Sequence, residues 1–171
     1  MDLHYYRKPK QQHLDGILFM FRGASTLSLD DKGRFAIPTK YRNQLLADNG
    51  GEIICTINLS DPCLLLYPLS EWQVIEQRLA SLSNIKPRAK RMQRLLLGNA
   101  MDYQVDKNGR VLLAPHLRDY AQLGKKIVLV GQLNKFEIWD EARWQQQMQD
   151  DIAIELGQEF EQDEDLADFS F

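Results

Sequence analysis

The sequence predicts an α+β protein made of two tandem copies of one small module. The block 29–38 resembles the block 105–114 at an offset of 76 residues, and the block 64–72 resembles 136–144 at an offset of 72. In each copy, apolar residues alternate with polar ones on both sides of a turn, which is the pattern of a β-hairpin with one buried face. Each copy ends in a helical pattern with apolar residues on one side. A repeat of this length indicates a duplicated module.

A glycine lies at the centre of each predicted hairpin. Phe35 and Ile37 alternate with polar neighbours after the first turn, as two leucines do before it. Gly33 and Gly109 can adopt positive φ, and Asn108 directly before Gly109 is a strong signal for a tight turn. The two turns are therefore predicted to be the best-defined local features of the chain.

The remaining elements follow each turn in the same order: a helix opened by proline, two apolar strands and an amphipathic helix. The short helices are predicted at 39–46 and 116–123, the strands at 52–57, 64–67, 126–130 and 136–139, and the closing helices at 70–82 and from Asp140, a suitable N-cap. A basic helix, 84–97, joins the copies. The predicted inward faces are Trp72, Ile75, Leu79 and Leu82, then Met92, Leu95, Leu96 and Leu97, then Trp144, Met148 and Ile152.

These elements divide the chain into five segments. They are an N-terminal extension (1–19) that is expected to be disordered or not translated, a first module with its helix (20–83), a basic connecting helix (84–98), a second module with its helix (99–156) and an acidic tail (157–171) that is expected to be disordered.

Composition favours a packed protein of the cytoplasm. The 171 residues are 44% hydrophobic and 26% charged, and no apolar run reaches the ~20 residues of a membrane span. Cys55 and Cys63 lie in segments that are predicted to be buried strands, where a free cysteine acts as a small apolar residue. No histidine or further cysteine is nearby and the three histidines are scattered, so no metal site is predicted. No motif of a catalytic site or a cofactor site occurs. We expect a protein that is not an enzyme, has no cofactor and does not enter membranes.

Charge is segregated along the chain. Residues 144–171 contain nine acids and no Lys or Arg, which leaves 21 basic and 15 acidic side chains in residues 1–143. A basic body with an acidic tail is common in proteins that bind polyanions, although solubility alone accounts for such a layout. The basic connecting helix is likewise interpreted as a solvated face.

The candidate site is the pair of turns. Each has the pattern Asp, three residues, Arg, with glycine before the arginine: Asp30 to Arg34 and Asp106 to Arg110. Asp and Arg flank a tight turn, so their side chains can meet, and such an exposed pair stabilises by only ~0–1 kcal/mol. The aspartates and the turn glycines are interpreted as structural. An arginine fork also fits a phosphate or the edge of guanine, and further basic residues lie near in sequence.

Several ordered motifs resemble the MraZ family of bacterial DNA-binding regulators. They are Met20-Phe21-Arg22-Gly23-Ala24, the turn from Leu29 to Pro38, Cys63 to Pro68 with Glu71-Trp72, Arg94 to Gly98, and Gly131-Gln132 with Asn134 to Glu137 and Trp139. The resemblance spans Met20 to about Gln147. It implies tandem AbrB-like swapped-hairpin modules that form a pseudo-twofold β-barrel core, and assembly into a ring-shaped homo-oligomer.

The resemblance also implies a function. The protein is expected to bind short G-rich direct repeats in double-stranded promoter DNA and to repress its own division and cell-wall gene cluster, in the cytoplasm at the nucleoid. The motif of Asp and Arg then assigns Arg34 and Arg110 to guanine, and Lys32, Lys40, Arg42, Lys107 and Arg118 to phosphates, with Asp30, Gly33, Asp106 and Gly109 structural. Because Asn108 stands where the first copy has Lys32, the two copies need not contact DNA equally.

Two alternatives remain beside the regulator. One is a ring-shaped scaffold that acts mainly through protein partners. The other is an antitoxin-like module, which predicts a single hairpin module with a toxin-binding tail, whereas this chain has two copies. A small-molecule substrate is not expected.

Overall fold

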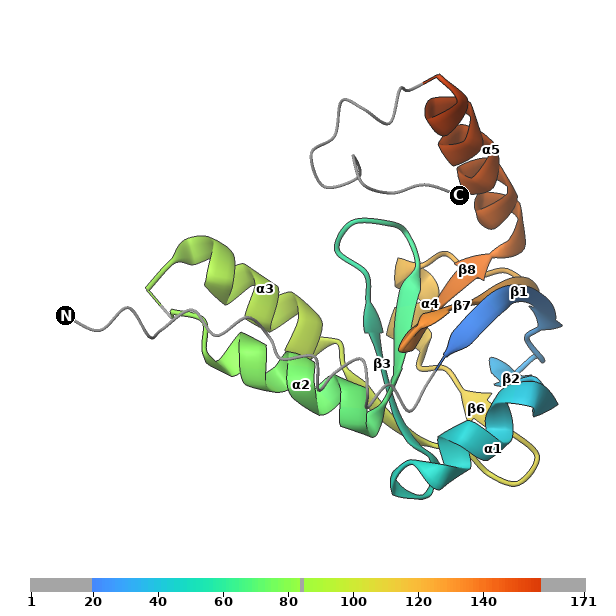
Figure 1. The fold of residues 1–171 in the computed structure, drawn as a ribbon, viewed down its shortest axis with the longest axis horizontal. Coiled ribbons are helices and arrows are strands. Elements are labelled where there is room, and N and C mark those ends of the chain that lie inside the picture. Colours follow the sequence, from blue (N-terminus) through green and yellow to red (C-terminus); the bar gives the residue numbers. More distant parts are fainter. Residues whose placement is uncertain (1–19, 84, 158–171) are drawn as a thin grey trace.

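Six antiparallel strands form the main sheet, in the order β1-β7-β8-β4-β3-β5, and β2 and β6 form a second, two-stranded sheet. The computed structural model describes residues 20–83 and 85–157 (Figure 1). The strands are β1 (Phe21–Ser28), β2 (Arg34–Ala36), β3 (Glu52–Ile57), β4 (Leu64–Pro68), β5 (Met101–Gln104), β6 (Arg110–Leu112), β7 (Lys126–Leu133) and β8 (Lys135–Asp140). The predicted mixed α and β content and the antiparallel strands are confirmed.

The two copies of the repeat exchange strands. β1 of the first copy pairs with β7 of the second, and β5 of the second copy pairs with β3 of the first. Repeat-equivalent residues face each other at the centre of both sheets: Phe35 opposite Val111, and Leu65 opposite Glu137. The strand order therefore has the same sequence of equivalent strands from either end, which is an internal twofold pseudo-symmetry.

The prediction that the two strands beside each turn pair with one another in a hairpin is wrong. β1 and β2 flank the first turn, yet β1 pairs with β7 and β2 pairs with β6. β2 has three residues and β1 has eight, so β2 could satisfy only part of the backbone of β1. β7 pairs with β1 along its whole length, which leaves no inner N–H or C=O of β1 unpaired on that side.

Five α-helices accompany the sheets in the described residues: α1 (Thr39–Ala47), α2 (Leu69–Ala80), α3 (Pro87–Gly98), α4 (Pro115–Tyr120) and α5 (Glu141–Leu156), with a short 3₁₀ turn, η2 (Asn49–Gly51). The predicted cap of α5 is confirmed, because Asp140 Oδ1 accepts hydrogen bonds from the N–H groups of Ala142 (3.1 Å) and Arg143 (3.3 Å). α2 and α3 lie side by side and project from one side of the sheet (Figure 1). α5 follows β8 and extends away from a different part of the sheet (Figure 1).

The largest of the buried clusters in the described residues unites the two copies. Phe136 of the second copy stacks on Phe21 of the first with 4.2 Å between ring centroids, and the ring of Tyr41 lies 4.9 Å from that of Phe136. Trp72 and Trp139 are buried, and Trp144 packs against Trp139 with 5.8 Å between centroids. The predicted inward position of Trp72 is therefore confirmed, in a smaller cluster with Ile54 and Tyr67, and Trp144 packs at the margin of the cluster that contains Trp139.

The predicted inward faces of two helices are partly wrong. In α3, Leu95 and Leu97 are 40% and 41% exposed, and the buried residue of that helix is Ala89. In α5, Met148 and Ile152 are 38% and 50% exposed. Only the beginning of α5 packs on the sheet, and the rest of the helix extends past it (Figure 1). The apolar stripe is present in each sequence, but the chain places little against it.

Several predictions concern residues that the structure does not describe. The N-terminal extension (1–19), Asn84 and residues 158–171 of the acidic tail lie outside the described ranges. Between residues 20 and 157, Asn84 excepted, no helix combines the length and the apolar character needed to cross a membrane.

Candidate nucleic-acid interface

The same hydrogen-bond pattern holds both turns. Asp30 Oδ1 accepts from the backbone N–H groups of Lys32 (2.9 Å) and Arg34 (2.8 Å). In the second copy, Asp106 Oδ1 accepts from the N–H groups of Asn108 (2.8 Å) and Arg110 (3.0 Å). Each aspartate thereby satisfies two backbone donors that the tight turn leaves without a strand partner. The sequence spacing of Asp and Arg is thus the spacing that one carboxylate needs to close the turn.

The turn glycines connect the two copies. Gly33 and Gly109 have φ values of 84° and 71°. The carbonyl oxygen of Gly33 accepts from the N–H of Leu113 (3.0 Å), and that of Gly109 accepts from the N–H of Ile37 (2.8 Å). Each turn is therefore tied to the strand end of the opposite copy, which makes the pair of turns a single support.

Arg42 and Arg118 brace the turns from beneath. A Cβ atom added at Gly33 would lie 2.7 Å from the guanidinium of Arg118, and one at Gly109 would overlap Nε of Arg42. Nε of Arg42 donates to the carbonyl oxygen of Ile37 at 2.7 Å. Nε of Arg118 is buried and has no hydrogen-bond partner among the described residues. The structure thus places both arginines against the turns of the opposite copy, half-buried. Their contact with phosphate stays a prediction.

Arg34 and Arg110 occupy equivalent positions but have different surroundings. Nε of Arg34 forms an ion pair with Asp30 Oδ2 at 2.6 Å, and the two side chains are 42% and 40% exposed. Arg110 is exposed and makes no such ion pair within the described residues. Since an exposed pair contributes little stability, its main effect is to orient the Arg34 guanidinium. Of the two candidate base-reading side chains, Arg34 is therefore the one that a contact within its own turn holds in place.

The lysines of the candidate site are only partly brought together. Lys32 and Lys107 are exposed on the two turns. Lys40 lies over the ring of Tyr41, 4.7 Å from its centroid, and its Nζ is 3.7 Å from where a Cβ of Gly23 would be. Gly23 precedes the end of β1 by five residues, roughly 16 Å of strand. The structure therefore separates Lys40 from the first turn, although the two are close in sequence.

Two lysines that sequence reasoning missed lie beside the first turn. The carbonyl oxygen of Lys125 accepts from the N–H of Leu29 (2.9 Å), and Lys126 pairs with Ser28, to whose Oγ its Nζ donates at 3.1 Å. No local pattern indicated this, because the two lysines are almost 100 residues from the first turn in sequence.

The carboxyl groups of both turns have lowered pKa values. For Asp30, hydrogen bonds from the backbone N–H and then from the guanidinium of Arg34 hold the pKa below the ordinary 3.8. For Asp106, the backbone N–H of Arg110 is the main cause of the lowered pKa. Folding lowers both values, so the charged carboxylates stabilise the turns above pH 4, and this contribution is lost as pH falls through the lowered pKa values.

Removing the arginine side chains is expected to affect the two aspartates unequally. Arg34→Ala should raise the pKa of Asp30 part of the way back toward 3.8, because the guanidinium bond is lost and the backbone bond remains. Arg110→Ala should raise the pKa of Asp106 less, because no side-chain hydrogen bond is lost. NMR titration of the carboxyl carbons measures both, and equal shifts in the two variants would contradict the difference seen between the turns.

Metal ligands and reactive thiols are the other site types to consider within residues 20–83 and 85–157. No group of three or more His, Cys, Asp or Glu side chains in these ranges could hold a metal ion. Cys55 and Cys63 are free and buried, as predicted, and burial raises the pKa of the Cys63 thiol to about 12. Both thiols therefore remain protonated at neutral pH.

Fold and site together define a duplicated, strand-exchanged α+β protein that presents two equivalent turns, each ending in an arginine, on a common support. The model of the family described as "MraZ: MraZ protein, putative antitoxin-like" matches residues 20–95 and 96–167. A relative named "Transcriptional regulator MraZ" from Pseudoalteromonas translucida (strain TAC 125) is 66% identical over 88% of this chain and 99% of its own length. Relatives of the same name from Idiomarina loihiensis and Klebsiella pneumoniae (strain 342) are 57% and 52% identical with the same coverage. The chain belongs to the MraZ family.

Proposed function

We propose that this protein is a transcriptional regulator that binds promoter DNA through its two turns. The observation that carries the proposal is that Arg34 and Arg110 occupy equivalent positions on turns with the same hydrogen bonds, where Arg110 is exposed and the Arg34 side chain is 42% exposed. A rigid support reduces the entropy that a side chain loses when it contacts a base. The name shared by the relatives, "Transcriptional regulator MraZ", agrees with this role.

The two classes of basic side chain have different tasks in this proposal. Arg34 and Arg110 read guanine O6 and N7 in the major groove, where an arginine fork donates two hydrogen bonds. Lys32, Lys40, Arg42, Lys107 and Arg118 hold phosphates, which position the protein without specifying sequence. Of these, the half-buried Arg42 and Arg118 are the least accessible.

The same proposal extends to the fold type, the assembly and the DNA target. The strand exchange is that of AbrB-like swapped hairpins closed into a barrel, and copies of the chain assemble into a ring. The ring binds G-rich direct repeats, because several weak sites engaged together gain avidity. Repression of the protein's own division and cell-wall cluster, at the nucleoid in the cytoplasm, completes the role.

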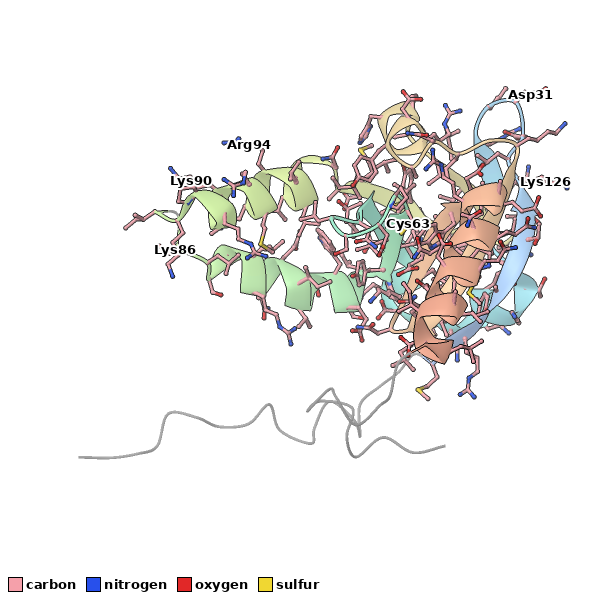
Figure 2. All side chains as sticks on the ribbon, turned by 90° about the horizontal axis from the view of Figure 1, so that it is seen from above. Asp31, Cys63, Lys86, Lys90, Arg94 and Lys126 are labelled. Atoms are coloured by element: carbon pink, nitrogen blue, oxygen red, sulfur yellow. The ribbon has the colours of Figure 1, made fainter. Side chains whose placement is uncertain are left out.

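A titration of wild type, Arg34→Ala and Arg94→Ala tests the proposal. The targets are a duplex from upstream of the protein's own gene and a scrambled duplex, each at several salt concentrations. Wild type should prefer the upstream duplex, and Arg34→Ala should lose about 5- to 150-fold on that duplex alone, the equivalent of ~1–3 kcal/mol. Arg94 is exposed on α3, at the opposite end of the molecule from the first turn (Figure 2), so Arg94→Ala is the charge-matched control.

Two results would count against this function. If wild type binds the upstream and scrambled duplexes equally well at every salt concentration, the protein is not a sequence-specific regulator of its own gene. Equal losses of affinity in Arg34→Ala and Arg94→Ala would show that Arg34 does not contact the bases.

A scaffold acting through protein partners is the second candidate. Exposed apolar side chains on α5 favour it, because Met148 and Ile152 are four positions apart and lie on the same side of the helix. Such side chains mark contact surfaces when they gather on one side of a helix. Salt separates the candidates, because binding driven by phosphates weakens steeply as salt rises.

A further inference from the structure

The first turn has two lysines as neighbours from the second copy. Lys125 and Lys126 begin β7 alongside the end of β1, so they lie directly beside the residues that lead into the turn. Both side chains are exposed. Figure 2 shows Lys126 and Asp31 of the first turn at the same end of the molecule, opposite the basic residues of α3.

The second turn has no lysine at the equivalent places. The N–H of Val105 donates to the carbonyl oxygen of Gly51 at 2.9 Å, just as Leu29 donates to Lys125. Gln104 pairs with Glu52, just as Ser28 pairs with Lys126. Pseudo-symmetry thus matches Lys125 with Gly51 and Lys126 with the exposed Glu52.

These neighbours reverse the charge difference between the turns. The turn 30–34 contains two acids and two bases and is neutral, whereas the turn 106–110 contains one acid and two bases and carries a charge of +1. With Lys125 and Lys126 included, the first turn reaches +2; with Glu52 included, the second falls to zero. The electrostatic preference of a polyanion therefore shifts from the second turn to the first.

We infer that Lys125 and Lys126 are phosphate-binding residues that make the first turn the stronger DNA contact. Nζ of Lys126 donates one hydrogen bond to Ser28 Oγ, and an ammonium has three donors, so two remain for a phosphate. This contact also holds the side chain over β1. The inference rests on the proposed function and deepens it, since unequal turns give a pseudo-symmetric protein a direction on its DNA.

The test compares two variants of the full chain that lose one positive charge each, Lys126→Gln and Arg94→Gln. Affinity for the upstream and scrambled duplexes is measured from low to high salt. Lys126→Gln should weaken both duplexes alike and reduce the slope of log affinity against log salt by about 0.9, the value for one phosphate contact. Arg94→Gln should keep the wild-type slope, because it is far from the turns. A wild-type slope in Lys126→Gln, or equal slopes in the two variants, would overturn the inference.

A second comparison tests whether the first turn contributes more to DNA affinity than the second. Arg34→Ala should lose more affinity than Arg110→Ala on the upstream duplex, and equal losses would overturn the ranking of the turns. Failure of the proposed function is distinguishable, because wild type would then show no preference for the upstream duplex. If wild type shows that preference and Lys126→Gln behaves like wild type, only the role of the lysines fails. Both lysines are exposed, so thermal unfolding of the variants should match wild type and verify that they fold.

Discussion

Gly109→Ala is expected to lower the free energy of unfolding by about 2–4 kcal/mol, a large effect for the addition of one methyl group. Gly109 has φ of 71°, which strains any residue with a Cβ atom. The new Cβ would overlap Nε of Arg42 and would lie 2.9 Å from the carbonyl oxygen of Ile37. Arg42 would have to move, and its hydrogen bond to Ile37 would be lost. The backbone oxygen of Ile37 cannot move without disturbing the contact between the copies.

Gly50→Ala is the matched control for that prediction. Gly50 has nearly the same φ, 72°, but a Cβ atom there would meet nothing within 4 Å. Only the backbone strain remains, about 1 kcal/mol. Urea unfolding of both variants gives the two free energies. Equal losses would show that the packing of Arg42 on the second turn is unimportant for stability.

Phe136→Ala is expected to destabilise the protein by about 3–5 kcal/mol, because it leaves a cavity in a fully buried position. The ring is in contact with Phe21 and Tyr41, which belong to the other copy of the repeat. The loss should therefore spread to both copies and preserve a single unfolding transition. Met148→Ala removes an apolar side chain that is 38% exposed on α5, and it should change stability by less than about 1 kcal/mol.

Amide hydrogen exchange shows whether the copies unfold together. In Phe136→Ala, protection should fall by the same free energy in β3 and β4 of the first copy as in β7 and β8 of the second. Loss of protection in β7 and β8 alone would contradict a shared core. It would show instead that each copy is stable by itself.

Local structure was predictable wherever a short stretch of sequence contained its cause. The two turns follow from an aspartate whose carboxylate reaches the N–H groups two and four residues later, and from a glycine that adopts positive φ. The cap at Asp140 and the strands β3 and β4 are equally local. Repeat periodicity also predicted that the equivalent tryptophans Trp72 and Trp144 occupy related places, although only Trp72 is fully buried.

Which strands pair with one another and which side chains are buried could be learned only from the tertiary structure. Alternation of apolar residues in β1 indicates which side chains are buried but not which strand completes its hydrogen bonds, and here that strand is β7. A helical stripe likewise indicates amphipathic character without supplying a surface to cover it. Ile152 of α5 is half exposed for that reason, because the sheet ends before the helix does.

The duplication, the two turns and the arginines that they present were predictable without any structure, because these depend on residues at most five positions apart or on direct self-similarity. Three features became visible only in the folded chain: the copies exchange strands, Arg42 and Arg118 pack against the turns of the opposite copy, and Lys126 and Glu52 lie at equivalent places beside the turns. The physical reason is that strand pairing brings together backbone groups about 100 residues apart. The net charge around each turn therefore depends on residues of the other copy as well as on the turn itself.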